Sequence, residues 1–159
     1  VHLAKDAYME MESVQIKGVD STNRITKADL AEGATFVVTE RLMTHGKQNA
    51  DSTFEVELNG EGSGTHIVSR AVARDESTQL FISKMSGNAA CNGHTECDAI
   101  IMDKAAIRAV PEISANCTDA SLIHEAAIGK IAGEQIIKLM TLGLTESEAE
   151  EQIINGFLR

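Results

Sequence analysis

Aromatic residues are scarce in this sequence. They make up 3% of the 159 residues, and tryptophan does not occur. The core must therefore be built mainly from Ile, Val, Leu, Met and Ala. Long apolar runs are also missing, and no stretch approaches the ~20 residues that a membrane-spanning helix needs. We expect no membrane among the partners of this chain.

Basic residues are outnumbered: 14 Lys and Arg stand against 24 Asp and Glu, which gives a formal net charge of −10. Nucleic-acid binding needs a basic surface that displaces counterions from phosphates, so this balance argues against a nucleic-acid partner. It also disfavours an anionic membrane surface. The sequence begins at Val1 rather than at a methionine, and we expect it to be a piece of a longer protein, truncated at its N-terminus.

Cysteine occurs three times, at Cys91, Cys97 and Cys117. An odd number excludes a complete disulfide framework within the chain. Free thiols suggest a reducing compartment, and we expect a cytoplasmic protein. Each cysteine alone is most simply a small buried hydrophobe, but their clustering after Ala90 points toward metal binding or catalysis.

Short β-segments separated by small polar turns fill the first three quarters of the chain. Phe54, Val56 and Leu58 alternate with polar residues, as in a strand with one dry and one wet face. A weaker alternation over residues 8–17 suggests another strand. The strands recur at intervals of roughly ten to twenty residues, which suits a β-sandwich or barrel and equally a β-solenoid. The pattern alone leaves both architectures open.

The C-terminal part has helical spacing. Apolar residues fall on one face at intervals of three and four, and Gly143 suits a left-handed helix end. Thr145 and Glu148 have the spacing of a capping box, which begins a second helix. The two helices form a helical hairpin that either closes the open end of a sheet or docks a partner. The residues expected on its apolar, partner-docking faces are Ile128, Ile131, Gln135, Leu139, Ile153 and Phe157.

Chemically active side chains gather before and at the switch from strands to helices. The segment from Cys91 to Cys97 holds two thiols and His94, but its spacing is not that of a zinc ribbon. Thiolates suit iron–sulfur clusters, zinc or copper(I), and a thiol beside an imidazole could also be a nucleophile. His124 and Glu125 are adjacent, and on a strand they would face opposite sides. A Cys/His hydrolase would need an oxyanion site and an orienting acid, and nothing in the sequence marks either.

Several ordered segments resemble the C-terminal half of the SufB/SufD family, the scaffold subunits of the SUF iron–sulfur cluster assembly machinery. The resemblance is strongest from about residue 80 to residue 159. The segments are Gly93-His-Thr-Glu-Cys-Asp-Ala-Ile-Ile-Met102, Pro111-Glu-Ile113, Asp119 through the His124-Glu125 pair to Gln135, Leu142-Gly-Leu-Thr-Glu-Ser-Glu-Ala149 and Asn155-Gly-Phe157.

The resemblance implies a right-handed parallel β-helix, a form of β-solenoid, over residues 1–122, followed by a helical segment over residues 123–159. It implies a non-enzymatic scaffold that builds a transient iron–sulfur cluster at the interface with a second SufB- or SufD-type protomer. It also implies that the helices dock a SufC-type ATPase. ATP hydrolysis is expected on that partner, since this chain has no phosphate-binding Gly-x-x-x-x-Gly-Lys-Ser/Thr loop. Whether a flavin takes part is left open.

The resemblance assigns cluster assembly to Cys97, His124 and Glu125, which are expected to converge. Cys97 makes the chain look SufB-like, because SufD-type subunits lack this cysteine and act as non-catalytic interaction partners. The chain departs from SufB proteins at Ile123, where they usually carry Glu, and no cysteine precedes Cys91 to receive sulfur. The candidate auxiliary ligands are Cys91, Cys117 and His94.

Overall fold

Ten strands and two helices make up the described part of the chain in this computed structural model, which describes residues 1–16 and 18–159. The final residue of the strand expected over 8–17 lies outside that description. The elements are β1 (His2–Leu3), β2 (Tyr8–Gln15), β3 (Ser21–Leu30), β4 (Thr35–Thr44), β5 (Asn49–Leu58), β6 (Gly64–Ala73), β7 (Thr78–Gly87), β8 (Asn92–Ile101), β9 (Ala106–Ala115), β10 (Ser121–Gly129), α1 (Gly133–Met140) and α2 (Glu146–Phe157).

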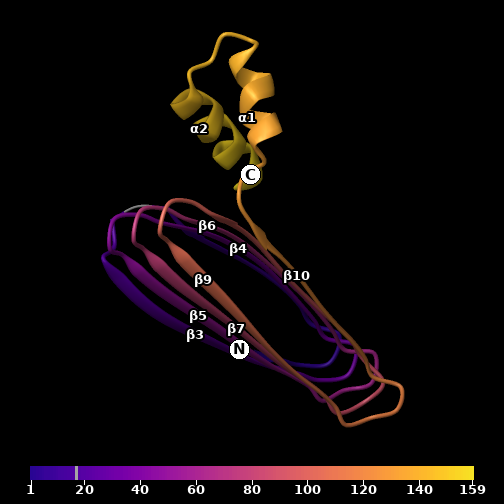
Figure 1. Ribbon diagram of the computed structural model, residues 1–159. Coiled ribbons are helices and arrows are strands. Elements are labelled where there is room, and N and C mark those ends of the chain that lie inside the picture. The colour runs from indigo at the N-terminus through magenta and orange to yellow at the C-terminus, as the bar shows by residue number, and fades with distance from the viewer. Residues whose placement is uncertain (17) are drawn as a thin grey trace.

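The strands form two parallel sheets that the chain visits in turn. One sheet has the order β1-β3-β5-β7-β9 and the other the order β10-β8-β6-β4-β2. Each pair of consecutive strands therefore completes one coil of a flattened β-solenoid (Figure 1). In the even-numbered sheet Thr35 pairs with Gly64, Gly64 with Asn92 and Asn92 with Ser121, so the repeat is 28 or 29 residues. The solenoid is confirmed over the sandwich.

The core lies between the two sheets, and each sheet contributes one layer of inward-facing side chains to it. Along β4 every second residue is buried, as the period of two in a strand requires. Phe36, Phe54 and Leu58 are fully buried, and the rings of Phe54 and Phe81 lie 5.9 Å apart. So narrow a core needs few aromatic side chains, which agrees with the composition.

Equivalent turns of successive coils stack on one another. Gly46, Asp75 and Asp103 occupy equivalent positions with positive φ of 60°, 58° and 53°. The Asp75 carboxylate accepts a hydrogen bond from the Gly46 amide at 2.7 Å, and the Asp75 amide donates to the Asp103 carboxylate at 3.1 Å. Short polar side chains tolerate this left-handed backbone best, which explains why the turns are rich in Gly and Asp.

Among the described residues, Glu40 places a charged group inside the solenoid. Glu40 is 1% exposed. Its carboxylate accepts hydrogen bonds from Arg24 at 2.9 Å, from Ser52 at 2.6 Å and from Ser69 at 2.9 Å. Because every buried carboxylate oxygen needs partners, these side chains form a single polar network across both sheets.

The helices begin later than the sequence suggested. Strand β10 runs to Gly129, and α1 begins at Gly133 rather than near residue 123. Nine consecutive residues of β10 pair with β8, and this backbone pairing outweighs the helix-compatible Ala126 and Ala127. The capping box between Thr145 and Glu148 is present, and Gly143 has a φ of +98°.

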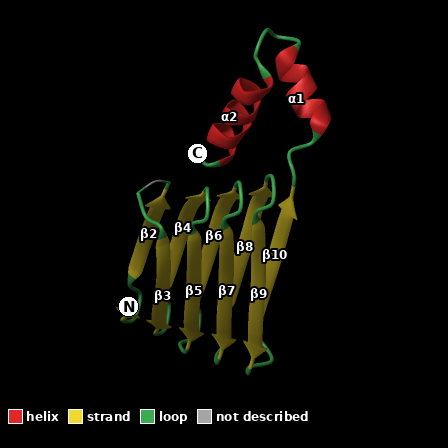
Figure 2. Ribbon diagram, turned by 60° about the vertical axis from the view of Figure 1, so that its left-hand side comes forward, coloured by secondary structure: helices red, strands yellow, loops and turns green. Residues whose placement is uncertain are grey.

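The hairpin stands over the turns at one margin of the solenoid, beyond the ends of the even-numbered strands (Figure 2). Arg70 donates to the Arg159 carbonyl at 3.0 Å, and Arg74 lies 3.9 Å from Glu150. Neither of the described helices has the length and apolar character to cross a membrane.

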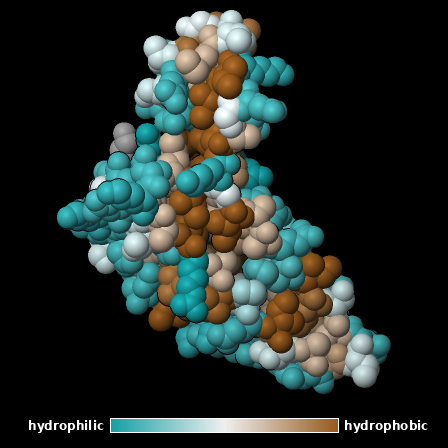
Figure 3. All heavy atoms as spheres, viewed as in Figure 1, coloured by the Kyte–Doolittle hydropathy of each residue, from teal (hydrophilic) through white to brown (hydrophobic). Residues whose placement is uncertain are grey.

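The hairpin does not cover the last coil of the solenoid. Strands β9 and β10 are the outermost members of their sheets. Three of their isoleucines are exposed: Ile113 by 43%, Ile123 by 50% and Ile128 by 39%. Figure 3 views this end and shows apolar surface gathered over it. The last coil therefore ends in an open edge, with partly exposed apolar side chains.

Candidate functional site

The predicted cluster-assembly residues lie on β8 and β10, the last two strands of the even-numbered sheet. These strands pair in parallel, with Thr95 in register with His124, Glu96 with Glu125, and Cys97 with Ala126. Residues in register face the same side of a sheet, and successive residues face opposite sides. Cys97 and His124 therefore face the interior of the solenoid, whereas Glu125 faces outward. The structure brings the first two together and does not bring Glu125 to them.

Cys97 is sealed within the core. Its exposed fraction is 0%, and it lies in register between Ser69 of β6 and Ala126 of β10. Loss of hydration on burial raises the pKa of the Cys97 thiol to about 12, and the charges of Glu40 and Asp98 act in the same direction. At neutral pH the side chain is a neutral thiol, so it needs a cation to become a thiolate ligand.

His124 lies on the same inward face, diagonally across from Cys97. It is half-buried, and its Nδ1 atom is buried without a hydrogen-bond partner among the described residues. Burial lowers the pKa of His124, and the nearby His94 lowers it further. The imidazole is therefore neutral at physiological pH, which is the form that ligates metal ions.

Glu125 belongs to a second group on the outer face. Its carboxylate lies 3.3 Å from the Nε2 atom of His94. Ligand atoms of His94, Glu96 and Glu125 all lie within 4.8 Å of one another, a spacing that could hold a metal ion. The candidate auxiliary ligand His94 is thus placed beside Glu125 and across the sheet from Cys97.

Glu96 was not among the residues expected from the sequence. Two signals could have identified it. Glu96 and His94 are two residues apart, which places both on one face of a strand. Glu96 also precedes Glu125 by one 29-residue repeat, which places the two carboxylates side by side once the repeat length is known.

The other two cysteines differ in exposure. Cys91 is 2% exposed within the core, and Cys117 is half-buried in the turn before β10. Burial raises the pKa of the Cys91 thiol. All three cysteines are free thiols, and the structure assigns no ligand role to Cys91 or Cys117.

The helical residues expected to dock a partner have mixed exposure. Ile131, Leu139, Ile153 and Phe157 are half-buried, while Gln135 is exposed. Two of the expected residues lie outside the helices: Ile128 is at the end of β10, and Ile131 is in the link between β10 and α1. The most exposed apolar side chains of the hairpin are Ile137 at 62%, Met140 at 44% and Leu142 at 76%.

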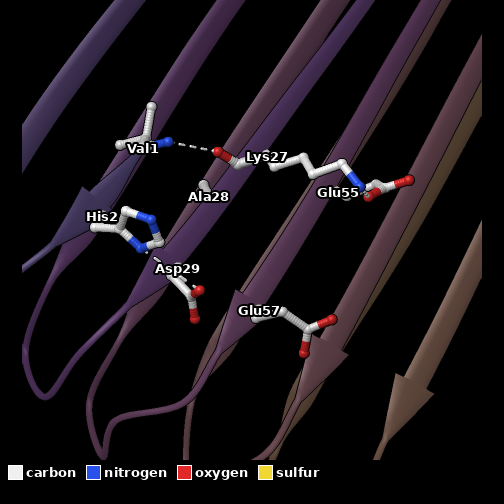
Figure 4. Close-up of a pocket in the computed structure, with 7 residues that line it drawn as sticks. All are labelled: Val1, His2, Lys27, Ala28, Asp29, Glu55 and Glu57. Atoms are coloured by element: carbon white, nitrogen blue, oxygen red, sulfur yellow. Dashed lines mark hydrogen bonds and ion pairs between the residues drawn. The ribbon is translucent and has the colours of Figure 1, made fainter.

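A shallow depression lies at the other end of the solenoid, on the outer face of the odd-numbered sheet (Figure 4). An ion pair and a hydrogen bond lie in it: Lys27 lies 2.6 Å from Glu55, and the Val1 ammonium donates to the Lys27 carbonyl at 2.7 Å. None of the site residues predicted from the sequence lines it. The candidate chemistry is confined to the last two coils.

Comparison with known proteins gives a family match that covers nearly the whole chain. Residues 1–157 match the family described as SUF system FeS cluster assembly, SufBD core domain. An iron-sulfur cluster assembly SufBD family protein of Methanothermobacter thermautotrophicus is 41% identical over 110 residues, 68% of this chain and 27% of that protein. One from Pyrococcus horikoshii is 40% identical over 106 residues, 65% of this chain and 24% of that protein.

A more distant SufBD family protein, from Synechocystis, is 26% identical over 121 residues, which cover 74% of this chain and 25% of that protein. The matched region is thus about a quarter of the length of these relatives. Since the family match covers nearly the whole chain, this protein belongs to the SufBD family of the SUF system, which takes part in iron–sulfur cluster assembly.

Proposed function

We propose that this chain is a scaffold on which a nascent iron–sulfur cluster is assembled as cargo, at the interface between two protomers. The observation that carries the proposal is the position of Cys97 and His124. Both face the interior directly behind the open edge of the solenoid. A second protomer that covers this edge would enclose His124 beside Cys97, which is already buried.

The donor types fit an iron–sulfur cargo. Cys97 supplies a soft sulfur ligand and His124 a neutral imidazole, and both donors occur at known clusters. Iron would lower the pKa of the thiol that it binds, which offsets the effect of burial. Two protein ligands leave a cluster incompletely held, and we expect such a cluster to be transferred more easily than one bound by four thiolates.

The proposed interface follows from the exposed edge. An unpaired parallel strand presents free backbone groups, and soluble proteins cover or block such edges. The hairpin does not cover β9 and β10, and Ile113 and Ile123 remain exposed there. Strand pairing with a second SufB- or SufD-type protomer would satisfy the backbone and bury these isoleucines.

The hairpin is proposed to dock a SufC-type ATPase, on which ATP hydrolysis takes place. Ile137, Met140 and Leu142 give it exposed apolar side chains. Such a patch on a small helical unit is typical of interaction sites. One chain would then engage a protomer at its edge and an ATPase at its helices.

Anaerobic reconstitution with iron and sulfide tests the cluster site. We expect Cys97→Ala and His124→Gln to lose most of the cluster absorption per protomer. Cys117→Ala is the matched control, because it removes a half-buried thiol outside the site and should retain the cluster. A Cys97→Ala protein that assembles as much cluster as the wild type refutes the proposed site.

Binding to a purified SufC-type ATPase tests the docking surface. Ile137→Glu should weaken binding, because it places a charge in the apolar patch. Ile25→Glu is the control: Ile25 is 58% exposed on β3, far from the hairpin. Equal binding by the two variants would exclude the helices as the docking site.

The burial of Cys97 favours one alternative, a SufD-like interaction subunit that organises the ATPase without holding a cluster. A thiol with 0% exposure and a raised pKa is also what a purely structural cysteine would show. Under this alternative the protein binds the ATPase, His124→Gln leaves that binding intact, and no cluster assembles under any reconstitution condition.

A further inference from the structure

Three potential ligands meet on the outer face of the even-numbered sheet, on the side opposite Cys97. Glu96 of β8 and Glu125 of β10 are directly in register, and His94 precedes Glu96 by two residues on the same face. The ligand atoms of the three side chains lie within 4.8 Å of one another. This spacing is set by the backbone pairing of β8 with β10, because all three residues lie within the paired strands and not in a loop.

The negative charge at this point is poorly compensated by the protein. Like charges placed directly opposite on neighbouring strands destabilise a sheet, and Glu96 faces Glu125 in this way. Asp98 adds a third carboxylate, and its hydrogen bond with Glu96 helps to raise the pKa of Glu96. Arg70 is in register with Asp98, and its charge acts in the opposite direction, but the pKa of Glu96 is raised on balance.

A nitrogen donor is available beside these carboxylates. The Nε2 atom of His94 is buried and makes no hydrogen bond among the described residues, although Glu125 lies 3.3 Å away. An unpartnered buried polar atom is costly, and coordination of a cation would satisfy it. The ring of His66 lies 5.0 Å from that of His94 and restricts its orientation.

We propose that His94, Glu96 and Glu125 bind a divalent first-row transition metal ion on the outer face of the solenoid. One imidazole with carboxylates suits Fe(II), Mn(II) or Zn(II), whereas a copper(I) site would need softer ligands. The ion neutralises the carboxylate pair and is bound by the lone pair of the His94 Nε2 atom. The identification of the physiological ion as ferrous iron rests on the proposed function; the metal site itself does not.

Anaerobic titration of the purified protein with Co(II), followed by visible absorption, tests the site. We expect the wild type to bind Co(II) at a site with the spectrum of nitrogen and oxygen ligation, distinct from any thiolate-to-metal charge transfer that Co(II) at Cys97 would add. His94→Gln and Glu96→Gln should weaken binding at least about tenfold, since even outer-shell partners of a metal typically contribute that much.

Two control variants give the experiment its specificity. Glu10→Gln changes the charge equally on the exposed face of β2 in the same sheet, and it should leave Co(II) affinity unchanged. Cys97→Ala should also leave it unchanged, because Cys97 faces the interior. Unaltered affinity in Glu96→Gln, or loss of the Co(II) site in Cys97→Ala alone, overturns the proposal.

A thermal-unfolding measurement excludes misfolding as the cause. Without metal, Glu96→Gln should melt no lower than the wild type, because it removes a like-charge contact. Added Co(II) should raise the melting temperature of the wild type and not that of Glu96→Gln. If Co(II) stabilises both proteins equally, the outer site is refuted, whatever cluster reconstitution shows for Cys97.

Discussion

Cys97 and Glu125 lie on neighbouring strands and face opposite sides of one parallel sheet, because Cys97 is in register with Ala126, the residue after Glu125. The sheet therefore separates a sulfur donor in a dry interior from carboxylates at the surface. The proposed cluster site and the proposed divalent-metal site use different faces of the same two strands. Each can be removed by mutation without direct loss of the other.

Thiol reactivity should differ sharply between Cys97 and Cys117. With a pKa of about 12, roughly one Cys97 side chain in ten thousand is a thiolate at about pH 8. We expect iodoacetamide to label Cys117 of the folded protein first, and to label Cys97 and Cys91 only in denaturant. Peptide mass spectrometry after timed labelling measures this. Equal labelling of Cys97 and Cys117 would show that the last coil opens readily.

The Glu40 network should contribute strongly to stability. Replacement by Ala removes the carboxylate that pairs with Arg24 and leaves the hydroxyls of Ser52 and Ser69 without this acceptor. Arg24 keeps its hydrogen bonds to Ser13 and Gln15. Breaking a buried pair in this way costs about 3 kcal/mol of unfolding free energy. Urea titration of Glu40→Ala against Glu10→Ala, an exposed residue of the same sheet, measures the loss. A loss below about 1 kcal/mol would mean that the network adds little.

A methyl group at Gly60 should be poorly tolerated. A Cβ atom there would overlap the backbone of Ala31 and Glu32 in the preceding coil, and backbone cannot move aside as a flexible side chain can. We expect Gly60→Ala to lower the free energy of unfolding by about 2 to 3 kcal/mol. At Gly64 the nearest atom to such a Cβ is the Asn92 carbonyl oxygen, 3.8 Å away. Gly64→Ala should therefore remain within about 1 kcal/mol of wild type in the same urea titration.

The sequence was informative where local pattern and structure coincide. The alternation at Phe54, Val56 and Leu58 predicted a strand, and the Thr145 capping box predicted the start of α2, both of which the structure contains. The choice of a solenoid over a sandwich came from the family resemblance, because both folds show the same alternation.

What the sequence did not reveal depends on stacking between coils. Ala126, Ala127 and Ile128 are compatible with a helix, and only their pairing with β8 makes them a strand. The closeness of Glu96 to Glu125 depends in the same way on the length of one coil. Such contacts join residues about one repeat apart, so a local pattern cannot show them until the turns have been placed.

The capping box should set the local stability of the hairpin. Thr145 accepts from the Glu148 amide at 3.3 Å, and the Glu148 carboxylate accepts from the Thr145 amide at 2.8 Å. Thr145→Ala should lower the local stability of α2 by about 1 kcal/mol. Hydrogen exchange measures this loss, because the α2 amides should exchange faster. Exchange in β4 should not change, and a uniform increase over the whole chain would contradict a local role.

The Thr145 amide and the Thr145 hydroxyl both donate to the Glu148 carboxylate, and these two bonds hold the pKa of Glu148 below its usual value. A carboxyl whose folded pKa is depressed adds stability above its unfolded pKa and loses that stability as the pH falls through the folded pKa. Exchange of the α2 amides, corrected for intrinsic rates, should therefore accelerate in acid. Glu148→Gln should show a weaker dependence on pH over that range.

His124 should make the protein less stable in mild acid. Its folded pKa is lowered by burial and by His94, so the unfolded chain binds this proton more readily than the folded chain does. The stability contribution is complete above the unfolded pKa and is lost as the pH falls through that value toward the folded pKa. The urea midpoint should fall between about pH 7.5 and about pH 5.5. His124→Gln should reduce that fall, whereas His45→Gln, an exposed turn residue, should not. If both variants follow the wild type, His124 is not the group that titrates, and its imidazole is not held neutral in the interior.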